Sequence, residues 1–209
     1  GGKRFTNEAR SYHEFVRAML LAQIGDISNP AYLICDSRFL WRYGLGAIKP
    51  FTVFLRRHLN ENYLYRGATI GKLAAEIGID PKTLETTVGQ YNRFAVEGRD
   101  PEFGRGEDAY QRHLGDADVA PNPCVRPVER PPFYAIAVYA GDLGTAAGLA
   151  TDPGGQVLNQ RGEPIAGLYA CGNDMASVME GAYPGPGITL GPTLTFGFLI
   201  GERLAALRR

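Results

Sequence analysis

Gly167-Leu-Tyr-Ala-Cys-Gly-Asn-Asp174 and Tyr183-Pro-Gly-Pro-Gly-Ile-Thr-Leu-Gly-Pro192 are the stretches that decide the fold of this chain. The first is a short apolar run, typical of a buried strand, that ends at a glycine. The second is a glycine-rich loop, and the residues after it, as far as Leu207, carry apolar side chains at helical spacing. Proline suits the first turn of that helix because its missing N–H would have no partner there. The order of strand, glycine-rich loop and helix predicts an α/β arrangement.

The glycine-rich loop has two interpretations. N–H groups at the start of a helix, with the positive end of its dipole, suit an electron-rich oxygen or a developing anion. Reduced flavin is a ligand of this kind, because it accumulates negative charge at N1 and O2. The spacing is equally typical of a tight packing turn. Many of the 27 glycines lie between Gly141 and Gly201 among apolar residues, which indicates backbone packed closely against a ligand or another backbone.

The composition excludes several classes of function. The 209 residues include 22 Lys and Arg and 22 Asp and Glu, so the chain lacks the basic balance that a nucleic-acid partner requires. No apolar run reaches the roughly 18 residues of a membrane span. The cysteines and histidines are scattered, so neither a disulfide framework nor a metal site is expected. They are Cys35, Cys124, Cys171, His13, His58 and His113.

Before the glycine-rich region, the periodicity predicts three helices. One is expected over residues 7–24, with Asn7 as its N-cap. A pair is expected over 69–78 and 81–95, because Asp80 before a proline is a favoured helix start. Such a pair resembles a DNA-binding helix-turn-helix, but the neutral charge argues against that function.

Strands are expected to end near Asp36 and to cover residues 133–139, and a hairpin is expected around Gly162. Residues 98–132 are polar and rich in Gly, Asp and Pro. We therefore expect a domain boundary near residue 131.

Two segments resemble the fumarate reductase and succinate dehydrogenase flavoprotein superfamily. In its C-terminal cofactor segment, a GLYA-x-G strand end precedes a glycine-rich loop and a helix ending in FG-x-x-x-G, and residues 133–207 follow this order as far as Phe196-Gly-Phe-Leu-Ile-Gly201. Lys3-Arg-Phe-Thr-Asn-Glu8 resembles the RF-x-NE element of the substrate-capping domain. The resemblance implies an FAD-dependent oxidoreductase with a mixed α+β and α/β fold.

The resemblance also implies a domain organisation. Residues 1–131 would form most of the α+β capping domain, and residues 132–209 the C-terminal segment of a Rossmann-like FAD-binding domain. The GxGxxG element that holds a pyrophosphate is absent, and the first residue is not Met. We therefore expect a fragment of a cytoplasmic protein, unless a targeting segment lies upstream. The missing N-terminal half would be its partner, and alone the fragment would bind FAD weakly or not at all and be inactive.

The branch of the superfamily follows from the loop. Dicarboxylate reductases carry an arginine where this chain has Pro184, and a pair of histidines in the run that matches residues 141–148. Without these cations a doubly charged substrate would be buried unpaired. The chain is more similar to the 3-ketosteroid 1-dehydrogenases, which share the patterns found at residues 139–145, 172–179 and 183–192.

In that family a tyrosine and a glycine N–H bind the ketone oxygen, which implies these roles for Tyr183 and Gly187, and a second tyrosine, matching Tyr12, acts as the base. Tyr12 is also compatible with an ordinary buried helix tyrosine. The cofactor-binding residues implied are Gly172, Asn173, Gly187, Thr189 and Leu190, and no metal is expected.

The expected function is oxidation of a CH–CH bond next to a steroid-like ketone. The alternatives are a fumarate reductase-type flavoprotein with another enone or acid substrate, an inactive fragment or homologue, and a binding or scaffold module.

Overall fold

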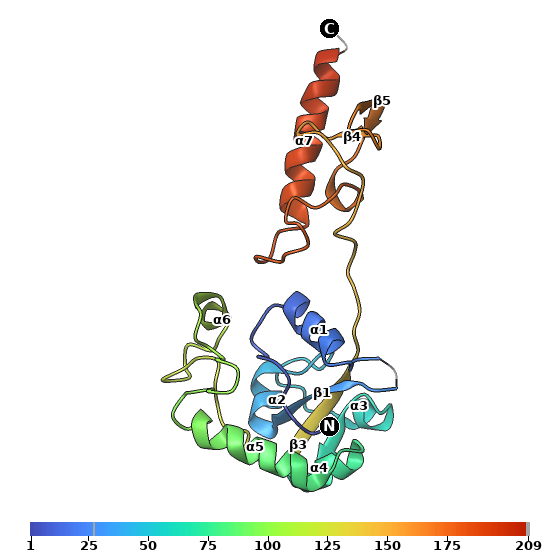
Figure 1. Cartoon of the computed structure of the whole chain (residues 1–209). Helices are drawn as coiled ribbons and strands as arrows, with labels where there is room; N and C mark the ends of the chain where they lie inside the picture. Colours follow the sequence, from blue (N-terminus) through green and yellow to red (C-terminus); the bar gives the residue numbers. More distant parts are fainter. Residues whose placement is uncertain (27, 208–209) are drawn as a thin grey trace. The chain divides into compact units, whose positions relative to one another are not determined.

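The computed structural model describes residues 1–26 and 28–207. The chain divides into two compact units, Gly1–Ala140 and Gly141–Arg209 (Figure 1). We call them unit 1 and unit 2. Among the described residues, no helix is long and apolar enough to cross a membrane.

Unit 1 is built on a three-stranded antiparallel sheet. Its strands are β1 (Ala31–Asp36), β2 (Tyr65–Gly67) and β3 (Phe133–Val138), and their spatial order is β1-β3-β2. The central strand, β3, is therefore the last in sequence. Its neighbours in the sheet, β1 and β2, lie about 100 and about 70 positions earlier in the chain, so this sheet ties the end of unit 1 back to its beginning.

Unit 1 also has six helices in its described residues, and most begin at a side chain that accepts a hydrogen bond from the first turn. Asp36, Thr69, Asp80 and Asp108 act in this way. The helices are α1 (Tyr12–Leu21), α2 (Ser37–Tyr43), α3 (Arg56–Asn60), α4 (Ile70–Glu76), α5 (Pro81–Ala95) and α6 (Ala109–His113).

The core of unit 1 lies on both faces of β3, because successive side chains of a strand point to opposite faces. Tyr134 and Ile136 pack with Leu40 and Leu64 on one face. Phe133 and Ala135 pack with the α4 residue Leu73 and its neighbour Ile77 on the other. A strand buried on both faces reads as continuously apolar, which is why residues 133–139 were recognisable as a strand.

Unit 2 contains a hairpin of β4 (Gln156–Leu158) and β5 (Pro164–Tyr169), the short helix η1 (Gly172–Asp174) and the long helix α7 (Leu190–Leu207). Its buried core is small and consists of Val157, Ala170 and Met175, with Cys171 and Phe196 packed against it. An ion pair between Arg203 and Asp152, at 2.9 Å, joins α7 to the loop before β4.

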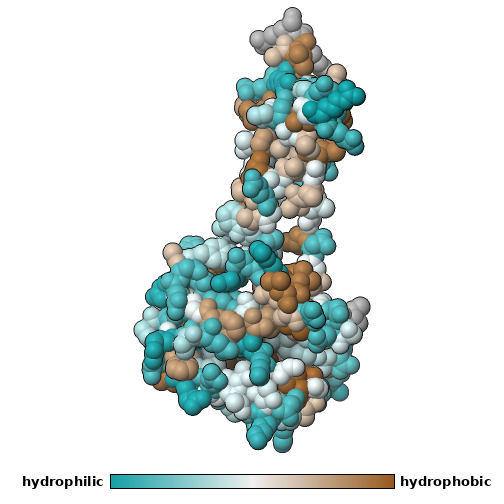
Figure 2. Space-filling model, in the orientation of Figure 1, coloured by the Kyte–Doolittle hydropathy of each residue, from teal (hydrophilic) through white to brown (hydrophobic). Residues whose placement is uncertain are grey.

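Helix α7 has no buried residue, although its sequence is mostly apolar. Leu194 and Phe198 are 71% and 65% exposed. Apolar side chains reach the surface of both units (Figure 2).

Two expectations from the sequence are corrected. The helix expected over residues 7–24 begins only at Tyr12, capped by Ser11, because Asn7 is used in contacts with a distant loop. The division between the two compact units falls after Ala140, because β3 pairs with β1 and β2 and so belongs to unit 1, and the expected boundary between a capping domain and an FAD-binding segment near residue 131 stays a prediction. The strand expected to be buried before Gly172 is largely exposed, and Ala170 is its one buried neighbour in residues 164–171.

Candidate functional site

The glycine-rich loop leads directly into α7. The carbonyl oxygen of Gly187 accepts a hydrogen bond of 2.7 Å from the N–H of Gly191, so Gly187 lies at the entrance to the helix. Its φ is +98°, a conformation that favours glycine, and a Cβ added there would meet no atom within 4 Å. The backbone at Gly187 is therefore accessible to a ligand. Tyr183, four positions earlier, is half-buried.

The strand-end glycine packs against the same end of α7. Gly172 has a φ of +62°, and a Cβ added there would lie 2.7 Å from Oγ1 of Thr193. The Thr193 hydroxyl in turn donates to the carbonyl of Thr189 at 2.6 Å. Gly172 is thus within one helical turn of the start of α7, and the structure brings together the strand end and the loop.

The remaining predicted cofactor residues line this region and are exposed. Asn173 follows Gly172, and its carbonyl accepts a hydrogen bond from the Thr145 hydroxyl at 3.2 Å. Thr189 and Leu190 form the start of α7, where Leu190 is 67% exposed. The first N–H groups of a helix have no partner within it. An exposed start of a long helix, flanked by glycines with open space around them, fits an electron-rich ligand such as FAD.

Tyr12 lies in unit 1, whereas the other predicted site residues lie in unit 2. It is the first residue of α1, and the Ser11 hydroxyl caps the helix by accepting from the N–H of Glu14 at 3.3 Å. Its side chain is 53% exposed, so the alternative of an ordinary buried helix tyrosine is wrong for this chain.

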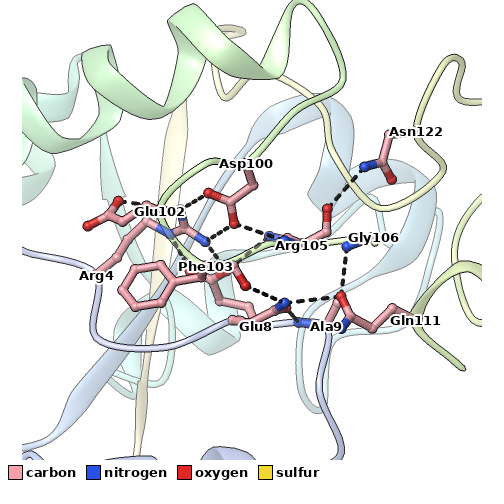
Figure 3. Close-up of polar contacts among 11 residues, drawn as sticks. Arg4, Glu8, Ala9, Asp100, Glu102, Phe103, Arg105, Gly106, Gln111 and Asn122 are labelled. Carbon is pink, nitrogen blue, oxygen red and sulfur yellow. Dashed lines mark hydrogen bonds and ion pairs between the residues drawn. The ribbon is translucent and has the colours of Figure 1, made fainter. Parts of the chain in front are cut away.

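Among the described residues of unit 1, the most extensive charge network is held by the RF-x-NE element before α1 (Figure 3). Arg4 binds two carboxylates at once. Its Nε and Nη2 donate to Glu8, each at 2.8 Å, and its Nη1 and Nη2 donate to Asp100 at 2.6 and 2.7 Å. Burial opposes the charge of the guanidinium, but the bonds with Asp100 and Glu8 outweigh it, and the pKa of Arg4 is raised.

Sequence reasoning noted this element as a motif but gave its residues no role. Arg4 and Glu8 are four positions apart but lie outside any helix, so helical spacing does not predict their ion pair. Asp100 lies 96 positions from Arg4. No periodic pattern links residues at that separation.

Comparison with known proteins supports the resemblance. A relative from Sinomonas cyclohexanicum, named 4-oxocyclohexanecarboxylate 2-dehydrogenase, is 42% identical over 98% of this chain and 35% of its own length. A 3-oxosteroid 1-dehydrogenase from Mycobacterium tuberculosis is 39% identical over 98% of this chain and 37% of its own length. The chain thus spans little more than a third of these relatives.

A solved structure gives the same result. The crystal structure of 3-ketosteroid delta1-dehydrogenase from Sterolibacterium denitrificans, in complex with 1,4-androstadiene-3,17-dione, is similar with a TM-score of 0.91 at 41% identity. The similarity covers 98% of this chain and 37% of that one. The mixed helix and sheet fold is therefore that of this group of flavoproteins.

The family model described as the FAD binding domain matches residues 1–190. The match includes the RF-x-NE element, the strand end and the glycine-rich loop as far as Leu190. The chain therefore belongs to the FAD binding domain family.

Proposed function

We propose that this chain is the C-terminal part of an FAD-dependent dehydrogenase that oxidises a CH–CH bond next to a cyclic ketone. The observation that carries this proposal is the loop from Tyr183 to Gly187. It offers a hydroxyl and an accessible backbone N–H at the start of α7, where a flavin fits. The relatives named 3-oxosteroid 1-dehydrogenase and 4-oxocyclohexanecarboxylate 2-dehydrogenase support this reaction class.

The chemistry requires loss of a proton from the carbon α to the ketone and of a hydride from the β carbon. An α C–H is too weak an acid unless negative charge on the oxygen is stabilised. The Tyr183 hydroxyl and the Gly187 N–H would donate to that oxygen, and each such donor is worth about 3 kcal/mol in an oxyanion hole. A side chain at position 187 would obstruct the approach of the ketone to the backbone.

Tyr12 would accept the α proton. A phenol keeps its own O–H proton in neutral water. Tyr12 can therefore take up the α proton only if another group accepts the phenol proton and relays it onward. We expect that group in the N-terminal half of the polypeptide. Removing the α proton from one side and the hydride from the neighbouring carbon leaves the C=C bond of the product.

FAD, when bound, supplies the acceptor for the hydride. Gly172 and Asn173 would contact its ribose or diphosphate, and the N–H groups of Thr189 and Leu190 would face flavin N1 and O2. In this proposal unit 1 is most of the substrate-capping domain and unit 2 the C-terminal segment of the FAD-binding domain. The N-terminal half would supply the pyrophosphate site.

Anaerobic reduction of the flavin tests the proposed function. The whole polypeptide, loaded with FAD, is mixed with a 3-ketosteroid, with 4-oxocyclohexanecarboxylate and with succinate, and the flavin absorbance is followed. We expect bleaching by one or both ketones and none by succinate, because Pro184 stands where dicarboxylate reductases have an arginine. Bleaching by succinate alone would replace this proposal with the fumarate reductase-type alternative. The ketone that bleaches the flavin faster identifies the substrate class.

A further inference from the structure

The segment from Arg4 to Ser11 has no helix or strand of its own before α1, so its shape depends on side-chain contacts. Helix α1 gives only Met19 to the buried core, near its C-terminal end. The N-terminal end, where Tyr12 lies, therefore needs a different anchor. The network around Arg4 provides it.

Arg4 is fixed from several directions. Its side chain is 11% exposed and that of Asp100 is 2% exposed. The guanidinium carbon lies 5.2 Å from the ring centre of Tyr91 and 4.8 Å from that of Phe103, a cation–π arrangement. Because the planar fork of arginine satisfies both carboxylates in one geometry, lysine cannot reproduce these contacts. Residues 4–8 are therefore joined to the loop around Asp100.

A second set of contacts continues from Glu8 toward α1. Asn7 donates to the carbonyl of Phe103 at 3.0 Å and to Gln111 at 3.1 Å, and accepts from the N–H of Ala9 at 2.9 Å. Asn7 is 2% exposed and Ser11, the cap of α1, is 9% exposed. The chain is thus held at residues 4, 7, 8, 9 and 11, and Tyr12 follows immediately.

We propose that Arg4 and Asp100 are positioning residues that fix the first turn of α1, and through it set the direction of the Tyr12 side chain toward the substrate. This inference rests on the proposed function, in which Tyr12 accepts the α proton. Buried ion pairs add little net stability compared with apolar packing, but they specify geometry. Proton transfer depends on geometry to within about 1 Å, and misplacement by that distance can cost roughly 100-fold in rate.

The test compares Arg4→Lys and Asp100→Asn with Arg57→Met in the FAD-loaded whole polypeptide. Arg57 forms an exposed i,i+4 pair with Glu61 in the same unit and is the matched control for the Arg4–Glu8 pair. We expect Arg4→Lys and Asp100→Asn to slow flavin reduction by the ketone roughly 10- to 100-fold. The kinetic isotope effect from deuterium at the α carbon should rise, FAD content should be unchanged, and Arg57→Met should match the wild type.

A double variant separates positioning from general destabilisation. If Arg4 acts through Tyr12, then Arg4→Lys should add no further slowing to a Tyr12→Phe protein, because the positioned group is already gone. Additive slowing would overturn the inference, as would wild-type rates in the single variants.

Should Arg4→Lys fail to fold, Glu8→Gln takes its place, because the Glu8 side chain is 25% exposed. A wild-type protein that no ketone reduces overturns the proposed function together with this inference, whereas an active wild type with unaffected variants overturns this inference alone.

Discussion

The two tyrosines of the proposed site have different roles: Tyr183 would donate a hydrogen bond to the ketone oxygen, and Tyr12 would accept the α proton. Substitutions can measure this difference. Tyr183→Phe removes one hydrogen-bond donor to the ketone oxygen, while Gly187 retains the other. We expect flavin reduction by ketone to slow by roughly tenfold or more, with FAD still bound. Tyr12→Phe removes the proposed base itself and should be more damaging. Stopped-flow absorbance of the flavin measures both rates, and wild-type rates in both variants would leave only the flavoprotein fold.

Cys35 gives a prediction that is independent of the reaction. It is 4% exposed, and burial, with a smaller contribution from the Asp36 carboxylate, raises the pKa of its thiol to about 12. An unfolded thiol loses its proton near pH 8.5. As the pH rises from there toward 12, the unfolded chain releases a proton that the folded chain keeps, so the free energy of unfolding falls by at most about 1.4 kcal/mol per pH unit.

Urea unfolding at about pH 8 and pH 10 measures this loss, which should be close to 2 kcal/mol over that interval. The control is Cys35→Ala, which is less stable at both values because of the cavity it leaves, but which lacks the thiol titration. Its stability should therefore fall less steeply than that of the wild type. Equal slopes in the two proteins would mean that Cys35 does not titrate as its burial requires.

At the scale of residues, local parts of the site were predictable and distant parts were not. Tyr183 and Gly187 share one loop, so their spacing is visible in the sequence, and the positive φ of Gly187 agrees with the choice of glycine. The exposure of Tyr12 was not predictable, because helical periodicity does not tell which face meets solvent at a helix end. Asp100 was missed since its partner Arg4 is remote in sequence.

At the scale of elements, the close approach of β2 to α4 requires glycine at position 67, because a larger side chain has no room there. A Cβ added at Gly67 would lie 2.6 Å from the Cα of Leu73, which is backbone within α4 and cannot move without shifting the helix. We expect Gly67→Ala to lower the free energy of unfolding by about 1–3 kcal/mol.

Gly89 is the matched position for that test. It lies on the exposed side of α5, and a Cβ there meets nothing within 4 Å. Gly89→Ala should raise the free energy of unfolding by about 0.5–1 kcal/mol, because alanine loses less entropy in a helix. Urea denaturation of the two variants gives both signs in one experiment. A loss of stability from Gly89→Ala, or none from Gly67→Ala, would contradict this account.

Helix starts that are determined locally were predicted well, as Asp80 shows. Asn7 has an equally suitable side chain for a cap, but tertiary contacts with Phe103 and Gln111 use it instead, and Ser11 takes over. The position of β3 in the sheet also depends on pairing with strands that lie about 100 and about 70 residues earlier in the chain. Local sequence can indicate that residues form a strand, but it does not specify the partner strand.

At the scale of the whole molecule, the exposed apolar side of α7 is the feature that the 209 residues leave without explanation. Leu194 and Phe198 are 71% and 65% exposed, and the described residues of unit 2 form a buried core of only Val157, Ala170 and Met175. Our proposal is that the N-terminal half of a longer polypeptide covers this helix and completes the FAD site. Leu194 and Phe198 should then contribute little to the stability of the 209-residue chain and much to that of the whole polypeptide.

We expect Leu194→Ser and Phe198→Ser to change the stability of the 209-residue chain by less than about 0.5 kcal/mol, as is usual for surface substitutions. In the whole polypeptide each should cost about 2–5 kcal/mol, as core truncations do, and should lower the flavin that co-purifies. Leu73→Ala is the control, because Leu73 is fully buried in unit 1 and should destabilise both forms alike. Urea unfolding and flavin absorbance measure these effects. If Leu194→Ser and Phe198→Ser left the stability unchanged in both forms, the N-terminal half would not cover α7. Stoichiometric flavin on the 209-residue chain alone would show that no such half is needed to hold FAD.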